Sequence, residues 1–332
     1  MEIPTPPSWR AILKRIIRPA GERQRLAKIL DLSTMTLTRW ISGESIPHKV
    51  HILRLLHVVN PALREELLDA LEADFPDIRQ SFKSEGIEHL SSAFFAELLN
   101  IRATTPVPLL FYLTGKTVLE KAITLLDPDR MGMAITLARC MPPVPEQHNK
   151  ILSLKEVAGR GTPPWKADLE PESIFLGAES LAGYAMQKGH AMIVADLKAE
   201  TMRQTRRTEH EVSSAVYPIM LSGRVAGCLI ASSTQPGYFT SEYTELLEIF
   251  SHLASLAFEQ DEFYPLSMIS LQILPSQEVQ LPIIGKFWRR SMEIQEESLQ
   301  RGESISNAEA EKLALQEIEA ELLARAAKKV RI

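Results

Sequence analysis

The stretch RQRLAKILDLSTMTLTRWISGESIP, residues 23–47, decides how the first part of the chain folds. Leu26 and Leu30 lie four residues apart and share one side of a first helix. Ser33 is a suitable N-cap for a second helix, and Gly43 is a suitable residue to end it. The few residues between the two helices leave room only for a tight turn. The pattern therefore predicts two short helices that cross closely.

Further helices are predicted on both sides of this pair. Apolar residues recur with helical spacing between Trp9 and Ile17, and Ser8 can cap the helix that they form. Another helix is expected over residues 48–59, directly after a proline, because proline fits near a helix start. Residues 1–60 are therefore predicted to form an all-α domain.

Charge is distributed unevenly along the sequence. Residues 1–60 carry ten Lys and Arg against four Asp and Glu, whereas residues 61–285 carry 18 against 29 and residues 286–332 carry nine of each. A basic domain attached to an acidic body is typical of a protein that docks one end on phosphates. A chance cluster of solvated charges would give the same counts, so the helical pattern has to decide between the two.

The same stretch resembles the helix-turn-helix domain of the lambda-repressor-like, or XRE, family. The residues that carry the resemblance are Leu26-Ala27, Leu32-Ser33, Leu37, Trp40, Gly43 and Pro47. Asp31 departs from the family, which usually has a glycine with positive φ there, but Asp tolerates that conformation better than most residues do. The resemblance implies that the helix after Ser33 enters the major groove of double-stranded DNA.

The resemblance also implies which side chains contact DNA. The predicted contacts to bases and phosphates are Arg23, Gln24, Ser33, Thr34, Met35, Thr38, Arg39, Ser42 and Lys49. Met35 could instead be a packing residue, and Arg39 could be a solvated helix charge. The histidines of this region lack a carboxylate or cysteine that would complete a metal site, so no metal is expected.

The middle of the chain changes from helical to strand periodicity. Residues 61–104 are predicted to form a helical linker, a helix is expected over residues 117–126, and a closing helix over residues 241–259. Between these helices, strands are predicted over residues 131–141, 149–157, 191–197, 215–221 and 224–233. Ser222-Gly223 predicts an antiparallel hairpin between the last two. An α+β domain with an antiparallel sheet is therefore expected over residues 105–260.

This region resembles a GAF domain. The resemblance rests on IFLGAESLAGYAMQKGHAMIVADL (174–197), on YPIMLSGRVAGCLIASS (217–233) and on Tyr238-Phe239-Thr240 before the closing helix. GAF domains bind small molecules of several classes and also dimerise. The resemblance therefore implies a sensor or dimerisation domain without naming its ligand.

A ligand pocket is expected between the sheet and the segment 177–190. The candidates for its lining are Phe175, Tyr184, Met192, Asp196 and Tyr217. The aromatic members of this set could equally be core, and Asp196 could merely end a strand. The loop 159–171 is a candidate lid. The arginines between residues 203 and 207 could neutralise an acidic effector or stay solvated.

Enzyme signatures are missing from the sequence. Cys140 and Cys228 are the only cysteines, which excludes a disulfide framework and the clustered cysteines of the methionine-sulfoxide-reductase type of GAF domain. Cys228 lies in an apolar strand and is expected to be a buried small hydrophobe. A nucleophile elbow, a P-loop, an HExxH motif and a Rossmann glycine pattern are all absent from the sequence. A protein that is not an enzyme and has no cofactor is therefore predicted.

Residues 261–332 are predicted to form a helical C-terminal extension. In its last helix, Leu315, Ile318 and Leu322 form a narrow apolar seam that could join two subunits or pack on the chain's own sensor domain. No apolar stretch approaches the roughly 18 residues that a membrane helix needs. The first ten residues do not read as a signal peptide, which favours a cytoplasmic protein without a membrane partner.

Together these patterns predict a ligand-responsive transcription regulator. A homodimer would read a palindromic or pseudo-palindromic operator on double-stranded DNA through helix-turn-helix heads, under the control of a GAF-like sensor that takes a small-molecule effector. Two alternatives stay open. The chain could be a GAF-type redox or hydrolytic enzyme with a basic localising arm, or a DNA-bound scaffold whose GAF fold binds nothing small.

Overall fold

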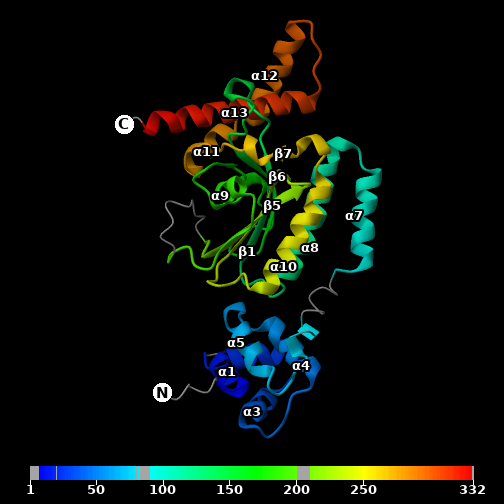
Figure 1. Cartoon of the computed structure of the whole chain (residues 1–332), viewed down its shortest axis with the longest axis vertical. Coiled ribbons are helices and arrows are strands. Elements are labelled where there is room, and N and C mark those ends of the chain that lie inside the picture. The colour runs from blue at the N-terminus through cyan, green and yellow to red at the C-terminus, as the bar shows by residue number, and fades with distance from the viewer. Residues whose placement is uncertain (1–6, 20, 80, 83–89, 200–209, 331–332) are drawn as a thin grey trace. The chain divides into compact units, whose positions relative to one another are not determined.

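The computed structural model describes residues 7–19, 21–79, 81–82, 90–199 and 210–330. The chain divides into two compact units. One comprises Met1–Ser92 with Pro236–Leu246, and the other comprises Ala93–Gln235 with Leu247–Ile332. Figure 1 labels the elements of both units.

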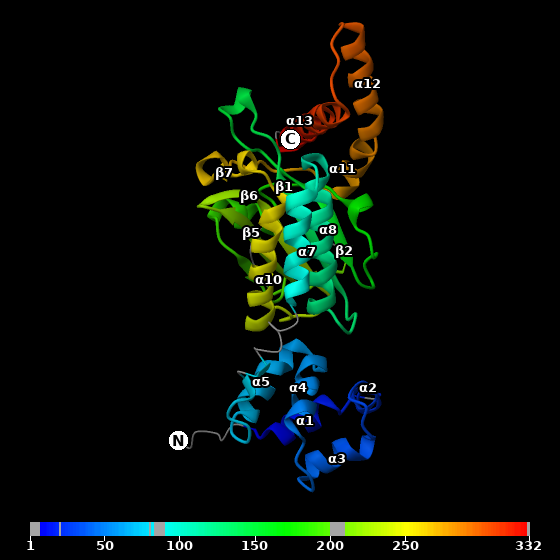
Figure 2. The same cartoon turned by 90° about the vertical axis from the view of Figure 1, so that its right-hand side faces the viewer.

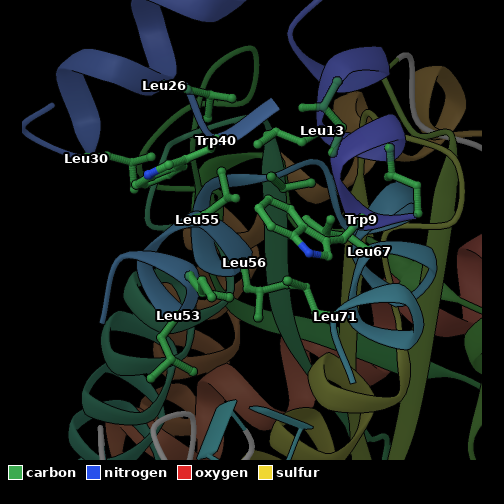
Figure 3. Close-up of a cluster of buried hydrophobic side chains, with 14 of the residues drawn as sticks. Trp9, Leu13, Leu26, Leu30, Trp40, Leu53, Leu55, Leu56, Leu67 and Leu71 are labelled. Carbon is green, nitrogen blue, oxygen red and sulfur yellow. The ribbon is translucent and has the colours of Figure 1, made fainter. Parts of the chain in front are cut away.

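The first unit is a bundle of short helices. They are α1 (Trp9–Ile16), α2 (Glu22–Ile29), α3 (Thr34–Ser42), α4 (Lys49–Val58) and α5 (Pro61–Leu71). Each helix contributes a buried apolar side chain to one core, part of which Figure 3 shows: Leu13, Leu26, Trp40, Leu55 and Leu67 are at most 3% exposed. The all-α character predicted for residues 1–60 is therefore observed.

This unit extends beyond the boundary predicted at residue 60. Leu67 and Leu71 of α5 belong to its core, as Figure 3 shows, and Nε1 of Trp9 donates a hydrogen bond to Oδ2 of Asp74 at 2.6 Å. Without α5, the faces of α1 and α4 that it covers would be exposed to water. The segment 61–104 is therefore not one linker, because its first helix, α5, completes the core of the first unit.

The second unit is built on a seven-stranded antiparallel sheet with the order β3-β2-β1-β6-β5-β4, in which β7 also pairs with β6. The strands are β1 (Met133–Cys140), β2 (Leu154–Gly161), β3 (Phe175–Leu176), β4 (Met192–Val194), β5 (Ser213–Leu221), β6 (Arg224–Ser233) and β7 (Tyr264–Pro265). The predicted hairpin between β5 and β6 is confirmed. It turns at Ser222 and Gly223, whose φ angles of 51° and 76° match a primed hairpin turn.

Helices cover both faces of this sheet. α8 (Val107–Leu126) and α10 (Ser241–Ala254) lie on one face, α9 (Leu181–Lys188) lies on the other, and α7 (Ser92–Thr104) lies outside α8 and α10 (Figure 1 and Figure 2). The apolar core beneath α9 combines its own Ala185 and Met186 with Val216 of β5 and Cys228 of β6. The unit is therefore α+β, as predicted.

The C-terminal segment is helical and packs on the second unit itself. Its helices are α11 (Gln277–Ile284), α12 (Phe287–Gln300) and α13 (Asn307–Val330). Ile318 and Leu322 are fully buried in a cluster with Phe175 of β3 and Ile283 of α11. The apolar seam of α13 therefore packs on residues of the same chain, which is the second of the two alternatives that the sequence left open.

Several predicted elements have different bounds in the structure, and the reason is clear for two of them. β2 begins at Leu154 rather than at residue 149, because Ile151 and Leu152 bond to the segment 268–272 instead of to β1. α8 begins ten residues before the helix predicted over 117–126, because its prolines lie at the N-cap and in the first turn, where no intrahelical N–H bond is lost.

Short 3-10 helices complete the second unit: η1 (Pro145–Gln147), η2 (Glu170–Glu172), η3 (Ser255–Ala257), η4 (Gln260–Glu262) and η5 (Leu266–Met268). Among the described residues, none of the helices combines the length and apolar character needed to cross a bilayer.

Candidate functional site

The turn between α2 and α3 has the conformation that the sequence predicts. Asp31 has a φ of 54°, in the left-handed region. Its N–H donates to the Lys28 carbonyl at 3.3 Å, and the N–H of Leu32 donates to the Ala27 carbonyl at 2.9 Å. These two bonds form a Schellman motif, which satisfies the last carbonyls of α2 and reverses the chain toward α3.

α3 is fixed at both ends and on its inner face. The Ser33 hydroxyl accepts a hydrogen bond from the Thr36 N–H at 3.1 Å, which caps the first turn. Gly43, with a φ of 82°, ends the helix. Leu37 and Trp40 are buried in the core of the first unit, so the opposite face of α3 points to solvent.

The predicted DNA contacts lie on α3, at its N-cap, on α2 and at the start of α4. Every one of them is exposed in the structure: Arg23, Gln24, Ser33, Thr34, Met35, Thr38, Arg39, Ser42 and Lys49. Met35 is 60% exposed, which excludes its alternative as a packing residue within this unit. Exposure is a condition for binding DNA and does not demonstrate it, so these contacts stay predictions. The described part of the chain contains no group of His, Cys, Asp and Glu that could hold a metal ion.

A cavity of about 130 Å³ lies in the second unit, on the α9 face of the sheet. Its polar lining consists of Thr136, Glu156, Glu172, Ser173, Ser180, Glu211, Ser214, Ser232 and Gln277. Its apolar lining consists of Ala134, Ala158, Trp165, Leu169, Ile174, Leu176, Leu181, Ala182, Val216 and Ile230. The wall therefore combines apolar surface with hydroxyl and carboxylate groups.

The carboxylates of this wall are held by hydrogen bonds. Oε2 of Glu156 accepts from the Ile174 N–H at 3.0 Å, and Oε1 of Glu211 accepts from the Ser232 hydroxyl at 2.6 Å. Glu172 forms an ion pair with Lys166 at 2.5 Å, and the Lys166 side chain is 71% exposed. These bonds orient one oxygen of Glu156 and one of Glu211, and Glu172 meets a cation.

The first turn of α9 forms one end of the cavity. The Ser180 hydroxyl accepts from the Gly183 N–H at 2.9 Å and donates to the Gly177 carbonyl at 2.8 Å. A Cβ at position 183 would lie 2.0 Å from the Gly177 oxygen, so only glycine allows this approach. The stretch that carried the resemblance to a GAF domain therefore builds this end.

The predicted pocket residues do not line the cavity. Phe175 and Tyr217 lie on strands whose neighbouring positions face it, so alternation turns their own side chains to the opposite side. Tyr184 and Met192 are half-buried outside the lining, and Asp196 accepts a hydrogen bond from the Lys198 N–H in a local turn. The cavity has the predicted location beside α9, but aliphatic, hydroxyl and acidic residues and Trp165 line it in place of the five predicted residues.

The loop predicted as a lid contributes Trp165 and Leu169 to the lining. The rings of Trp165 and His210 lie nearly perpendicular to each other, with centroids 5.9 Å apart. The arginines at positions 203, 206 and 207 lie outside the described residues.

The cysteines lie away from the cavity wall and are fully buried. Burial raises the pKa of Cys140 to about 12, and burial also raises the pKa of Cys228. Because the thiolate is the reactive form, both thiols are poor nucleophiles and poor redox groups. Cys228 is a buried apolar residue, as predicted.

Comparison with known proteins identifies the second unit. A family model described as "GAF domain" matches residues 114–259. This chain contains a GAF domain. The match includes β1 to β6 and ends within the segment that follows α10. The matched residues also include α9 and every residue of the cavity lining except Gln277.

Parts of this chain are similar to several solved structures. They include a type II free methionine-R-sulfoxide reductase from Thermoplasma acidophilum (14% identity, 47% of this chain, 99% of that chain, TM-score 0.34). The GAF domain of a phosphoenolpyruvate-protein phosphotransferase from Acinetobacter also matches (16%, 49% and 89%, TM-score 0.34). So does the GAF-B domain of DevS from Mycobacterium smegmatis (20%, 46% and 92%, TM-score 0.31). No match was found among curated protein sequences.

Proposed function

We propose that this protein is a ligand-responsive, DNA-binding transcription regulator of the XRE helix-turn-helix type, with its GAF domain as the sensor. The observation that carries the proposal is the α2–turn–α3 arrangement. α3 is capped by Ser33, buried along Leu37 and Trp40, and exposed along Thr34, Met35 and Thr38. A helix presented in this way is what reading of the major groove requires.

The chemistry of the exposed face suits a base-reading role. Thr34 and Met35 offer a hydroxyl and an apolar surface for polar base edges and thymine methyl groups, and Arg39 suits guanine or a phosphate. Arg23 and Lys49 lie outside α3, and we assign them to the phosphate backbone, where they fix the register of the helix. The surplus of basic residues in residues 1–60 supports this assignment.

The proposal includes a homodimer, because a single short head buries little surface and reads only a half-site. Two linked heads gain effective concentration on neighbouring half-sites. Exposed apolar side chains on α7 and α8 support self-association through the second unit: Phe95, Leu99, Val107, Leu109, Tyr112 and Leu113. The effector would control the dimer only by binding two of its arrangements with different affinity.

We propose that the protein is not an enzyme and that it acts in the cytoplasm. The raised pKa values of both buried cysteines argue against the redox alternative. The scaffold alternative differs from the sensor in one respect, namely whether the cavity of about 130 Å³ takes a ligand. Mass spectrometry of the denatured, purified protein separates the two through the presence or absence of a released small molecule.

The test of DNA reading is capture of genomic DNA fragments by the purified full chain at near-physiological salt, followed by sequencing. We expect an enriched motif with two-fold symmetry for the wild type. The double variant Thr34→Ala with Arg39→Ala should lose the motif and keep weak capture, because its phosphate contacts remain.

A matched control is Arg289→Ala with Glu293→Ala, which removes an exposed pair from α12. This variant should recover the same motif as the wild type. Weak capture without a motif, equal in all three proteins, would reduce DNA binding to phosphate attraction and contradict the proposal.

A further inference from the structure

We propose that the cavity of the GAF domain binds a small uncharged molecule, namely an apolar body about the size of a benzene ring that carries one hydrogen-bonding oxygen. This inference rests on the proposed function, because it names the chemical class of the effector that the sensor takes. It is carried by the Thr136 hydroxyl on the floor of the cavity, by the pairing of the charged groups at its wall and by its size.

The floor of the cavity is formed by neighbouring residues of β1, β6 and β5. Two rows of paired residues cross these strands, and all of their members line the cavity. The rows are Thr136 with Ile230 and Val216, and Ala134 with Ser232 and Ser214. Glu156 and Ala158 continue the lining on β2, the strand on the other side of β1. Thr136 therefore has lining residues on both of its neighbouring strands.

The hydroxyls of this floor differ in what they bond. The Ser232 hydroxyl donates to Oε1 of Glu211 at 2.6 Å, and the Ser214 hydroxyl donates to the Ala231 carbonyl at 3.2 Å. Thr136 is half-buried, and its hydroxyl forms no hydrogen bond with any residue that the structure describes. A hydroxyl that is shielded from water and lacks a partner costs free energy. A ligand oxygen that bonds to Thr136 would remove this cost.

The charged side chains at the wall are engaged within the protein. Glu172 forms an ion pair with Lys166 at 2.5 Å. The Lys155 ammonium donates to the Ser173 hydroxyl at 2.8 Å and to the Glu156 carbonyl at 2.7 Å. Ser173 itself lines the cavity, so charged groups of both signs meet at this wall.

These pairings disfavour a charged ligand. The carboxylates of Glu156 and Glu211 also accept hydrogen bonds, from the Ile174 N–H and from the Ser232 hydroxyl. A ligand ammonium or carboxylate would lose its water on entering the cavity and would have to compete with these partners for the charges of the wall. An uncharged oxygen loses much less hydration, and one hydrogen bond replaces it.

The size of the cavity limits the ligand. A dry cavity of about 150 Å³ engineered into another protein holds one benzene molecule. The cavity here measures about 130 Å³. A tetrapyrrole or a nucleotide is several times larger than this space, so the ligand is a small molecule with one ring or a short chain.

Apolar side chains surround the remaining volume and account for the body of the ligand. They come from the sheet, from α9 and from the loops beside them: Trp165, Ile174, Leu176, Leu181, Val216 and Ile230. A hydrocarbon placed against them is removed from water, which favours binding. Trp165 also serves as a reporter, because a ligand beside an indole ring changes its fluorescence.

The test compares four ligands of similar size on the full-length protein: benzyl alcohol, benzylamine, benzoate and ethylbenzene. Thermal unfolding and Trp fluorescence are followed during titration up to millimolar concentrations or the limit of solubility. Benzyl alcohol should raise the unfolding temperature and bind at least tenfold more tightly than benzylamine and benzoate. Either charged ligand binding as tightly as benzyl alcohol, or no binding of benzyl alcohol, would overturn the proposal.

A matched variant locates the binding. Thr136→Val keeps the shape of the side chain and removes the hydroxyl, so it should weaken benzyl alcohol binding about fivefold and leave ethylbenzene binding unchanged. The control Thr124→Val, at an exposed position of α8 on the other face of the sheet, should bind both ligands like the wild type. Unchanged benzyl alcohol binding in Thr136→Val, or an equal loss in the control, would contradict the assigned site.

The same samples separate this inference from the proposed function. Thr34→Ala with Arg39→Ala should bind benzyl alcohol like the wild type while losing the DNA motif. A wild type that captures the motif and ignores benzyl alcohol would refute only the ligand class. A wild type that binds benzyl alcohol and captures no motif would refute only the DNA-binding role.

Discussion

Asp31 shows how a single residue sets the geometry of the head. Its φ of 54° is costly for most L-amino acids, and the resemblance to the XRE family had indicated a glycine-like conformation at this position. The two hydrogen bonds of the Schellman motif hold this conformation. The backbone of the turn could therefore be predicted from the sequence, because its chemistry is local.

We expect Asp31→Gly to raise the free energy of unfolding of the first unit by about 0.5 kcal/mol, because glycine adopts positive φ without steric strain but loses more backbone entropy. Asp31→Val should lower it by roughly 1–2 kcal/mol, because a β-branched residue is strained there. Urea unfolding of both variants measures the difference. If the Asp31→Val variant were as stable as the wild type, the strained turn would be contradicted.

Glu319 is a second residue with a testable consequence. It is 2% exposed, and the Ser153 hydroxyl donates to its Oε1 at 2.5 Å. Burial raises its pKa from 4.5 to about 7. The folded state therefore holds this proton more tightly than the unfolded state, and the stability that this provides is present below about pH 4.5 and is lost as the pH rises through about 7.

We expect Glu319→Gln to remove this pH dependence, because glutamine stays neutral and keeps an acceptor for Ser153. Between pH 5 and pH 8, the wild type should lose on the order of 2–3 kcal/mol of stability relative to the variant. Urea unfolding across this pH range checks the prediction. Parallel pH profiles for the two proteins would show that Glu319 is already ionised in the folded state.

At the scale of elements, the sequence predicted features that depend on neighbouring residues, but it did not predict pairings between distant segments. The helices of the head and the β5–β6 hairpin follow from caps, spacing and a turn dipeptide. The start predicted for β2, residue 149, was wrong. Residues before Leu154 bond to a segment more than 100 residues away, and no local pattern encodes such a pairing. The cavity lining was missed for a related reason, because strand alternation alone does not say which face will be hollow.

α7 leaves apolar side chains exposed to water. It is apolar around most of its circumference, and Phe95 and Leu99 are 37% and 60% exposed. Leu113 of α8, 38% exposed, adds to the apolar surface of these helices. We expect light scattering to show a dimer for the wild type, because such surface is costly in water.

Leu99→Glu with Leu113→Glu should convert this dimer into a monomer. Met292→Glu provides the control, because Met292 is exposed to a similar degree, 61%, on α12. A monomeric wild type would contradict the dimer. A dimer that survives the double substitution would place the subunit contact elsewhere.

At the scale of the whole molecule, the basic surplus lies in the part of the chain that carries the predicted DNA contacts. Residues 1–60, which contain α1 to α4, carry ten Lys and Arg against four Asp and Glu. α5 and the GAF domain lie within residues 61–285, which carry 18 against 29. The positive charge that would attract phosphates is therefore concentrated on α1 to α4 and is not a property of the whole first unit.

The central claim is that the head reads a DNA sequence, and fluorescence anisotropy tests it most directly. A labelled duplex with the captured motif is titrated beside a scrambled duplex of the same composition, at one near-physiological salt concentration. We predict that the wild type binds the motif at least about 10³-fold more tightly, and that Thr34→Ala with Arg39→Ala binds both duplexes alike. Equal affinity of the wild type for the two duplexes would contradict the account.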